Sequence, residues 1–245
     1  MHARALALAV FLTATLLAAP AHAEDVVPEA PVVVDDAVTL WPGAYAEIDV
    51  LANDSDPAGD DLALCRMPPL WSPEDENPAT AVSVLDESIF DGPVGTVMVQ
   101  AGPRARGTHV IDYYVCNHTR LTPAHLTVTI RPVQPVDVVP PRMPDRIRVT
   151  NHNDRGVLFI ATDKTGCLVD IHARVDAGET RTFRVRRHAL RWYAFIGSGS
   201  DRGIADYGTV RGIDLTRPSA EPGPDNEFCS YAWSRQLPGI GASGS

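Results

Sequence analysis

The sequence has few basic residues, and lysine is almost absent. The 245 residues contain a single lysine, Lys164, and 21 Lys and Arg in all against 31 Asp and Glu, a formal net charge of −10. The acidic residues are concentrated in residues 24–133, where 18 Asp and Glu stand against 5 Arg, while residues 134–245 have 13 against 15 Lys and Arg. Because contact with phosphates along nucleic acid needs a basic footprint, this balance argues against nucleic acid as a partner.

The motifs of common enzymes and metal sites are also missing. The sequence has no C-x-x-C, no G-x-S-x-G and no H-E-x-x-H, which disfavours a zinc ribbon, a thioredoxin-type centre and motif-bearing hydrolases. His109, His118 and His125 do not have the spacing of metal ligands. We therefore predict a protein that is not an enzyme. A hydrolase is the alternative, and it predicts Ser, His and Asp from separate loops clustered in a cleft.

Long apolar runs are absent except at the N-terminus. Residues 5–17 are almost all apolar, Arg4 precedes them, and an Ala-His-Ala cleavage pattern ends at residue 23. This is the organisation of a secretory signal peptide, and the run is shorter than the roughly 20 residues that a membrane span needs. The sequence predicts a signal peptide over 1–23, a disordered lead-in over 24–30, no membrane span after cleavage, and an extracellular protein.

The few cysteines fit that compartment. Four cysteines in an exported chain most simply form two disulfides. Cys65 and Cys116 lie in the first half of the chain, and Cys167 and Cys229 in the second. Of the three possible connectivities, we predict the one that keeps each pair local, 65–116 and 167–229.

Short strand-like segments separated by turn residues fill the first half. Residues 45–50 alternate acidic and apolar side chains, and residues 126–130 place their Leu, Val and Ile on one face, the period-2 pattern of half-buried strands. Further strands are expected at 32–34, 38–40, 62–65, 82–85, 96–99 and 109–116. About seven short strands in about 100 residues predict a β-sandwich.

Three segments in this half resemble a known family. Residues 50–62 read VLANDSDPAGDDL and resemble the VLANDSDPDGDxL signature of bacterial Ig-like, cadherin-like domains of exported actinobacterial proteins. Residues 107–117 and 124–130 resemble the last two strands of that family. The resemblance covers residues 31–133 and implies an adhesive or structural module. The chain departs from the family at Ala58, which replaces an Asp of the signature, and in its cysteine pair.

Strand alternation places the Cys65–Cys116 bridge on an outer face of this sandwich. If Leu64 faces the core, Cys65 faces away from it, and with Tyr113 inward Cys116 faces outward. The alternative is a bridge buried between the sheets, as in antibodies. That arrangement would need a bulge, and Tyr114, two residues before Cys116, has the spacing of the Ig tyrosine corner. Alternation favours the outer face.

The second half predicts a separate unit. Residues 134–145 are rich in proline and predict a semi-rigid linker. Strands are then expected at 146–150, 157–161, 167–172, 181–187, 190–196 and 207–215. Their spacing resembles the accessory sandwich that accompanies such modules. The predicted fold is therefore all-β, with two tandem Ig-like β-sandwiches at 31–133 and 146–216, and a flexible tail over 217–245 that Cys229 pins back.

The acidic turn of the family signature is the candidate metal site. It gathers hard oxygens of the kind that calcium prefers, although Ala58 removes one of them. The alternative is a turn whose Asn and Asp side chains bond their own backbone. The candidate calcium ligands are Asn53, Asp54, Asp56, Asp60 and Asp61.

One basic cluster is the candidate binding surface. It contains Arg181, Arg184, Arg186, Arg187 and Arg191. Arg184 and Arg186 would share a strand face, and we name them with Arg187 as candidate binding residues for an anionic wall polymer or for the acidic first half. The alternative is a solvated outer face.

The sequence as a whole predicts a secreted, non-enzymatic Ig-like protein that acts as a structural, adhesive or binding module at the cell surface. Its partner would be an unidentified protein or a cell-wall polymer. A carbohydrate- or wall-binding accessory protein is a further alternative, which predicts that Trp41 or Trp71 lies exposed beside a groove.

Overall fold

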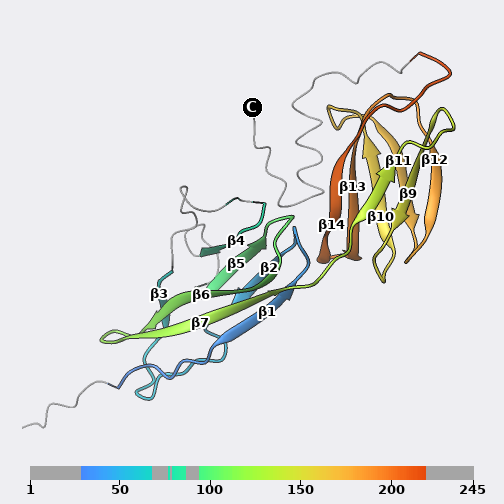
Figure 1. The fold of residues 1–245 in the computed structure, drawn as a ribbon. Coiled ribbons are helices and arrows are strands. Elements are labelled where there is room, and N and C mark those ends of the chain that lie inside the picture. Colours follow the sequence, from blue (N-terminus) through green and yellow to red (C-terminus); the bar gives the residue numbers. More distant parts are fainter. Residues whose placement is uncertain (1–28, 68–76, 78, 87–93, 219–245) are drawn as a thin grey trace, which may run out of the picture.

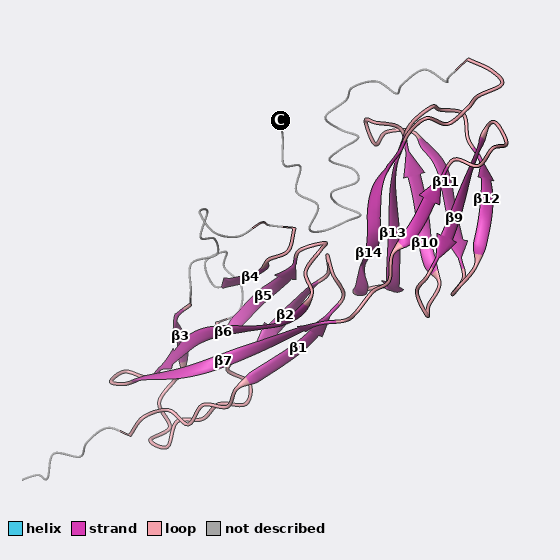
Figure 2. Cartoon of the chain, in the orientation of Figure 1, coloured by secondary structure: helices cyan, strands magenta, loops and turns pink. Residues whose placement is uncertain are grey.

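The fold is built entirely from strands. A computed structural model describes residues 29–67, 77, 79–86 and 94–218, and every regular element in them is a β-strand (Figure 1, Figure 2). In this part of the chain, no helix is long and apolar enough to cross a membrane. The segments predicted as signal peptide and pinned tail, together with Trp71 and Cys229, lie outside the described residues.

The first half folds into two facing sheets. One has the strand order β1-β7-β6-β3 and the other β2-β5-β4. The β1–β7 pair is parallel, and the remaining pairs are antiparallel. The strands are β1 (Asp36–Leu40), β2 (Tyr45–Asp49), β3 (Ala63–Arg66), β4 (Val82–Asp86), β5 (Thr96–Ala101), β6 (Gly107–Cys116) and β7 (Leu121–Ile130).

The core of this sandwich follows from alternation along the strands. Val97 and Val99 of β5 are fully buried, as are Val115 of β6 and Leu126 and Val128 of β7. Each is separated from the next buried residue of its strand by a side chain on the opposite face. The predicted all-β sandwich is confirmed, because the hydrophobic side chains of both sheets meet in one core.

The second half also forms two sheets, of order β12-β9-β8 and β11-β10-β13-β14. Phe159 fills the space between them and stacks on Phe183 and on Trp192, each with ring centroids 6.0 Å apart. The strands are β8 (Val136–Val139), β9 (Arg146–Asn151), β10 (Val157–Thr162), β11 (Val169–Val175), β12 (Thr180–Arg184), β13 (Leu190–Ser198) and β14 (Asp201–Val210).

Two expectations for this half need correction. The segment predicted as a linker contains β8, which pairs with β9 and buries Val136. Prolines flank this strand on both sides. Their number favours a linker in the sequence analysis, although the Val-Asp-Val-Val segment between them is typical of a strand. The last strand was expected at 207–215 but runs from Asp201 to Val210. A tight hairpin brings Asp201 opposite Ser198, so pairing with β13 begins directly after the Gly-Ser turn.

Candidate functional site

Hydrogen bonds to the carboxylate of Asp56 stabilise the acidic turn, and one of them comes from the side chain of Asn117. Asp56 Oδ1 accepts the backbone N–H groups of Ala58 and Asp60, at 2.9 and 3.2 Å. Its Oδ2 accepts the side-chain amide of Asn117 at 2.7 Å, 61 residues further along the chain. The Asn117 hydrogen bond, more than the backbone amides, lowers the pKa of Asp56. Both oxygens of Asp56 are therefore committed to amide donors.

Asp54 contacts the segment that precedes β1. Its Oδ1 accepts the backbone N–H of Val34 at 2.9 Å, while its Oδ2 is buried and has no hydrogen-bond partner among the described residues. Burial is the main cause of the raised pKa of Asp54, the Val34 amide opposes it, and the charges of Asp36 and Asp49 add to it. This carboxylate connects the turn to the segment before β1.

The remaining candidate ligands are an amide with a partner of its own and two exposed carboxylates. Asn53 donates its side-chain amide to Asp36 Oδ1 at 3.1 Å, and Asp60 and Asp61 are exposed. Among the described residues, no three His, Cys, Asp or Glu side chains gather closely enough to hold a metal ion. The hydrogen bonds of the turn are those of the structural alternative, and calcium binding is left to the experiment below.

We expect millimolar calcium and EDTA to give the same melting temperature. Calcium takes six to eight oxygens, and the best placed oxygens of the turn already accept amide hydrogens. Thermal melts followed by circular dichroism check this. A ligand present at about 100 times its dissociation constant would raise the melting temperature by roughly 10 °C. Such a shift, lost in Asp56→Asn and Asp60→Asn, would establish a calcium site instead.

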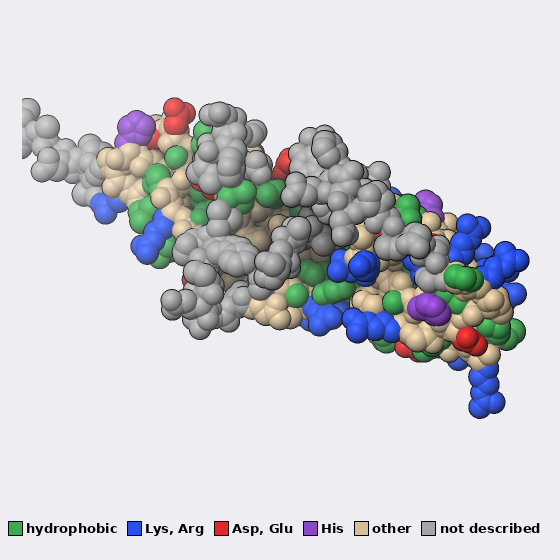
Figure 3. All heavy atoms as spheres, turned by 90° about the horizontal axis from the view of Figure 1, so that it is seen from above, with side chains coloured by type: hydrophobic (Ala, Val, Ile, Leu, Met, Phe, Trp, Pro, Cys, Tyr) green, Lys and Arg blue, Asp and Glu red, His purple; other side chains and the backbone are tan. Residues whose placement is uncertain are grey.

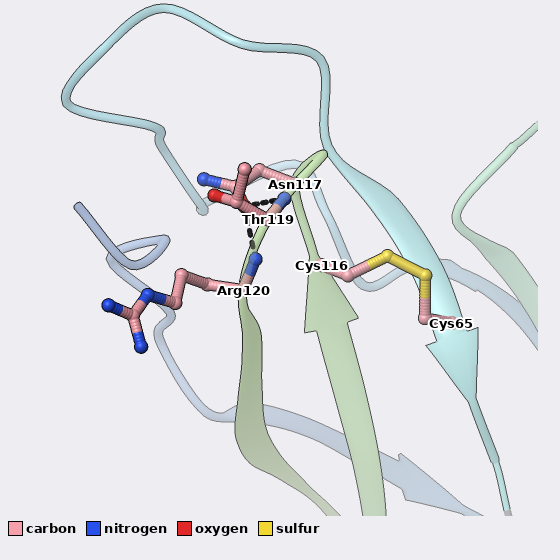
Figure 4. Close-up of a disulfide and its surroundings, with 5 residues drawn as sticks. All are labelled: Cys65, Cys116, Asn117, Thr119 and Arg120. Carbon is pink, nitrogen blue, oxygen red and sulfur yellow. Dashed lines mark hydrogen bonds between the residues drawn. A yellow bond between two sulfur atoms is a disulfide. The ribbon is translucent and has the colours of Figure 1, made fainter. Parts of the chain in front are cut away.

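The predicted bridge between Cys65 and Cys116 is present and lies on the outer face, with Cα atoms 5.8 Å apart (Figure 4). It joins β3 to β6, two neighbouring strands of one sheet, and Cys65 is exposed. The ladder is irregular between Leu64 and Arg66, so Cys65 occupies a bulge on the outer face. Cys167 is also disulfide-bonded. Its predicted pairing with Cys229 stays a prediction.

Asn117, directly after the bridge, is a residue whose role the sequence did not reveal. Its Oδ1 accepts the backbone N–H of Thr119 at 3.0 Å and that of Arg120 at 2.8 Å, which shapes the turn between β6 and β7 (Figure 4). Its amide group donates to Asp56. One side chain therefore orders both the hairpin and the acidic turn. A polar residue that follows a disulfide was the only signal.

The buried tyrosine of the first sandwich is Tyr113 rather than Tyr114. Tyr113 is fully buried, and its hydroxyl donates to Asp36 Oδ2 at 2.6 Å. Burial, and then this hydrogen bond, raise the pKa of Tyr113. Tyr114 lies under the guanidinium of Arg66, 5.6 Å from its ring centroid. The spacing of Tyr114 to Cys116 therefore does not mark a tyrosine corner.

The candidate arginines separate into different environments. Arg187 is only 8% exposed and forms an ion pair with Asp170, so it is not available to a polymer at the surface. Arg191 belongs to β13, in the other sheet. Arg181 reaches over Phe183 and donates to the carbonyl of Arg174. These positions correct the single cluster expected from the sequence.

Arg184 and Arg186 remain exposed, and the fold adds two arginines to them. Arg184 of β12 lies directly opposite Arg146 of β9, and Arg148 lies two residues further along β9. We call Arg146, Arg148, Arg184 and Arg186 the arginine face. Within the described residues, none of the four forms an ion pair with a carboxylate. Figure 3 shows Lys and Arg side chains gathered over the second half.

A buried junction joins the two sandwiches. Trp41 is 5% exposed, and the guanidinium groups of Arg131 and Arg155 lie over its ring, 5.0 and 5.8 Å from the centroid. The backbone N–H of Ile204, on β14, donates to the carbonyl of Pro42 at 2.6 Å. Trp41 is therefore not the exposed platform that a carbohydrate site would use.

Polar contacts surround this junction. Arg131 Nη1 donates to both carboxylate oxygens of Asp201, at 2.7 and 2.8 Å. Arg104 lies over the ring of Tyr207, 5.0 Å from its centroid. Two pairs of residues, Arg131 with Asp201 and Arg104 with Tyr207, therefore connect the first half to β14.

Two histidines have acidic neighbours: His125 on β7 and His152 directly after β9. His125 lies between Asp35 and Asp112, with N–O distances of 3.3 and 3.5 Å, and His152 contacts Asp137 at 2.8 Å. Both histidine side chains are about half exposed. In the part of the chain that the structure describes, neither is hydrogen-bonded to a serine hydroxyl.

The strand order and the buried core define an immunoglobulin-like class of β-sandwich. Residues 28–131 match the family described as the bacterial Ig domain, so the first sandwich of this chain is a bacterial Ig-like domain. The predicted resemblance of the first sandwich to bacterial Ig-like domains is thereby confirmed. No curated protein matches the chain.

Several solved structures match the chain at low similarity. A SusE-like surface-located polysaccharide-binding protein of Bacteroides thetaiotaomicron is 10% identical, with a TM-score of 0.36 over 75% of this chain. The chain spans 34% of that protein's length. A chimeric titin Z1Z2 is 9% identical, with a TM-score of 0.28 over 78% of this chain and 99% of its own. The Pseudomonas aeruginosa CupB2 chaperone is 10% identical, with a TM-score of 0.21 over 76% of this chain and 94% of its own.

Proposed function

We propose that this protein is a secreted, non-enzymatic module that works outside the cell as a structural and binding element, with its two sandwiches held as one rigid unit. The observation that carries the proposal is the junction around Trp41. A buried indole in contact with two guanidinium groups, next to the backbone hydrogen bond from Ile204 to Pro42, would fix how one sandwich sits on the other. A rigid unit of this kind presents its outer faces at a constant spacing.

The family supports the same role. The first sandwich is a bacterial Ig-like domain, and a disulfide on its outer face suits an oxidising compartment. A carbohydrate-binding accessory role is the second candidate, although Trp41 is buried. A hydrolase is a third candidate. Hydrolysis of nitrophenyl esters or glycosides by the purified chain, above the rate with heat-unfolded chain, would overturn the non-enzymatic role.

Nitrogen-15 relaxation on the chain without residues 1–23 tests the rigid unit. We expect backbone amides of both sandwiches to report one rotational correlation time, because a buried junction prevents independent tumbling. Amides of β6 and β13 provide matched probes, since both strands run through the centre of a sheet. Two shorter correlation times, one for each sandwich, would contradict the proposal.

A further inference from the structure

The arginine face concentrates positive charge where sheets usually avoid it. Arg184 and Arg146 are directly opposite each other on neighbouring strands, a position where like charges destabilise a sheet. Arg148 follows at two residues along β9, about 7 Å away at the strand rise. Arg186 is also exposed and lies two residues beyond Arg184. Three of the four arginines therefore lie on one face of the β12–β9 pair, and Arg186 is exposed in the segment that follows β12.

Few carboxylates neutralise the arginine face. The Asp145 carboxylate accepts hydrogen bonds from the hydroxyl and the backbone N–H of Thr216, which are the main cause of its lowered pKa, and the charge of nearby Arg184 lowers that pKa less. Asp137 lies on the same sheet face and pairs with His152. Both acids are thus engaged elsewhere, and the arginines keep their donors for a ligand.

We propose that the arginine face binds a linear polymer with repeated phosphate groups, of the glycerol-phosphate type found in cell walls. Guanidinium groups bind phosphate through two parallel hydrogen bonds. Four of them spread over β12, β9 and the segment after β12 fit several phosphates along one chain better than a single small anion. The hydroxyl of Thr182, directly opposite Arg148, adds a neutral donor to the arginine face.

The chemistry of the face disfavours nucleic acid. Single-stranded nucleic acid binds through aromatic side chains on which its bases stack. The ring of β12, Phe183, is on the opposite side of that strand from Arg184 and stacks on Phe159. A phosphate polymer without bases needs only the guanidinium donors.

The proposal rests on the extracellular role and is tested by measuring binding of poly(glycerol phosphate) by calorimetry. For about four contacts, the logarithm of affinity should fall with the logarithm of salt concentration with a slope of about −3. In the variant Arg146→Gln, Arg148→Gln, Arg184→Gln, this slope should become shallower, about −1. Binding should weaken about 100-fold at low salt.

The matched control removes three exposed arginines from other surfaces: Arg174→Gln, Arg202→Gln, Arg211→Gln. It lowers the net charge equally and should keep nearly all of the affinity. Equal loss in both variants, or no binding by the original chain, would overturn the proposal. Circular dichroism melts of both variants exclude unfolding as the cause of lost binding.

Binding of other anionic polymers, and self-association of the chain, test alternative roles of the arginine face. Polygalacturonate or oligothymidylate binding to the face as tightly as poly(glycerol phosphate) would overturn the phosphate-polymer assignment. Self-association that sediments as an oligomer and is lost in the face variant would assign the face to the acidic half of a second copy. A failure to bind any polymer, together with a single correlation time, would leave the rigid module intact and reject only the ligand.

Discussion

Replacing Trp41 with alanine is expected to lower the free energy of unfolding by about 3–5 kcal/mol, the range for truncation of a buried Trp. The indole is 5% exposed and packs under Arg131 and Arg155, so its removal leaves a cavity and two guanidinium groups without their aromatic partner. Urea unfolding followed by circular dichroism measures the loss. At about 2–4 °C per kcal/mol for a chain of this size, the melting temperature should fall by roughly 10 °C.

The same change should also uncouple the sandwiches. With Trp41→Ala, amides of the first and second half should give two correlation times in nitrogen-15 relaxation. Val110→Ala is the control, because Val110 is exposed on β6 and its truncation should change neither stability nor tumbling. Stability lost without uncoupling would show that Trp41 supports the fold alone and that other contacts fix the junction.

Gly203→Ala tests the junction by a change in the second sandwich, on β14, and leaves Trp41 in place. A Cβ atom at Gly203 would lie 2.2 Å from Trp41 Cβ and 2.6 Å from the carbonyl oxygen of Pro42. Neither neighbour is the end of a flexible side chain, so the first sandwich must move. We expect the correlation times to separate as in Trp41→Ala, with a stability loss of about 1–3 kcal/mol from overpacking.

The second large effect is expected from the disulfide. Replacing both Cys65 and Cys116 with serine should lower the free energy of unfolding by about 4 kcal/mol, because the bridge closes a loop of 51 residues and restricts the unfolded chain. Urea unfolding under non-reducing conditions measures the difference. Since the bridge is on the outer face, the substitution creates no core cavity, and the chain entropy should account for most of the loss.

Peptide mapping is the control for that experiment. The double variant should keep Cys167 in its disulfide, and the map should show a link between Cys167 and Cys229 in both chains. A loss below about 1 kcal/mol would contradict the entropic account. A link from Cys65 or Cys116 to either cysteine of the second half in the original chain would contradict the division into two local pairs.

The sequence by itself determined the all-β class, most strand positions and the outer-face position of the first disulfide. These features depend on the period-2 alternation of side chains, which is local and can be followed along residues such as Tyr113 to Cys116. The turn over 50–62 was also recognisable, because its Asn, Asp and Gly residues shape the backbone within a few positions.

Only the tertiary structure decided which charged and aromatic side chains are available. Arg187 is buried because Asp170 approaches from another strand, while Arg146 joins Arg184 through the pairing of β9 with β12. Trp41 becomes a junction residue because β14, about 160 residues later, covers it. Each of these outcomes depends on packing between segments far apart in the chain, and no periodicity within one segment encodes it.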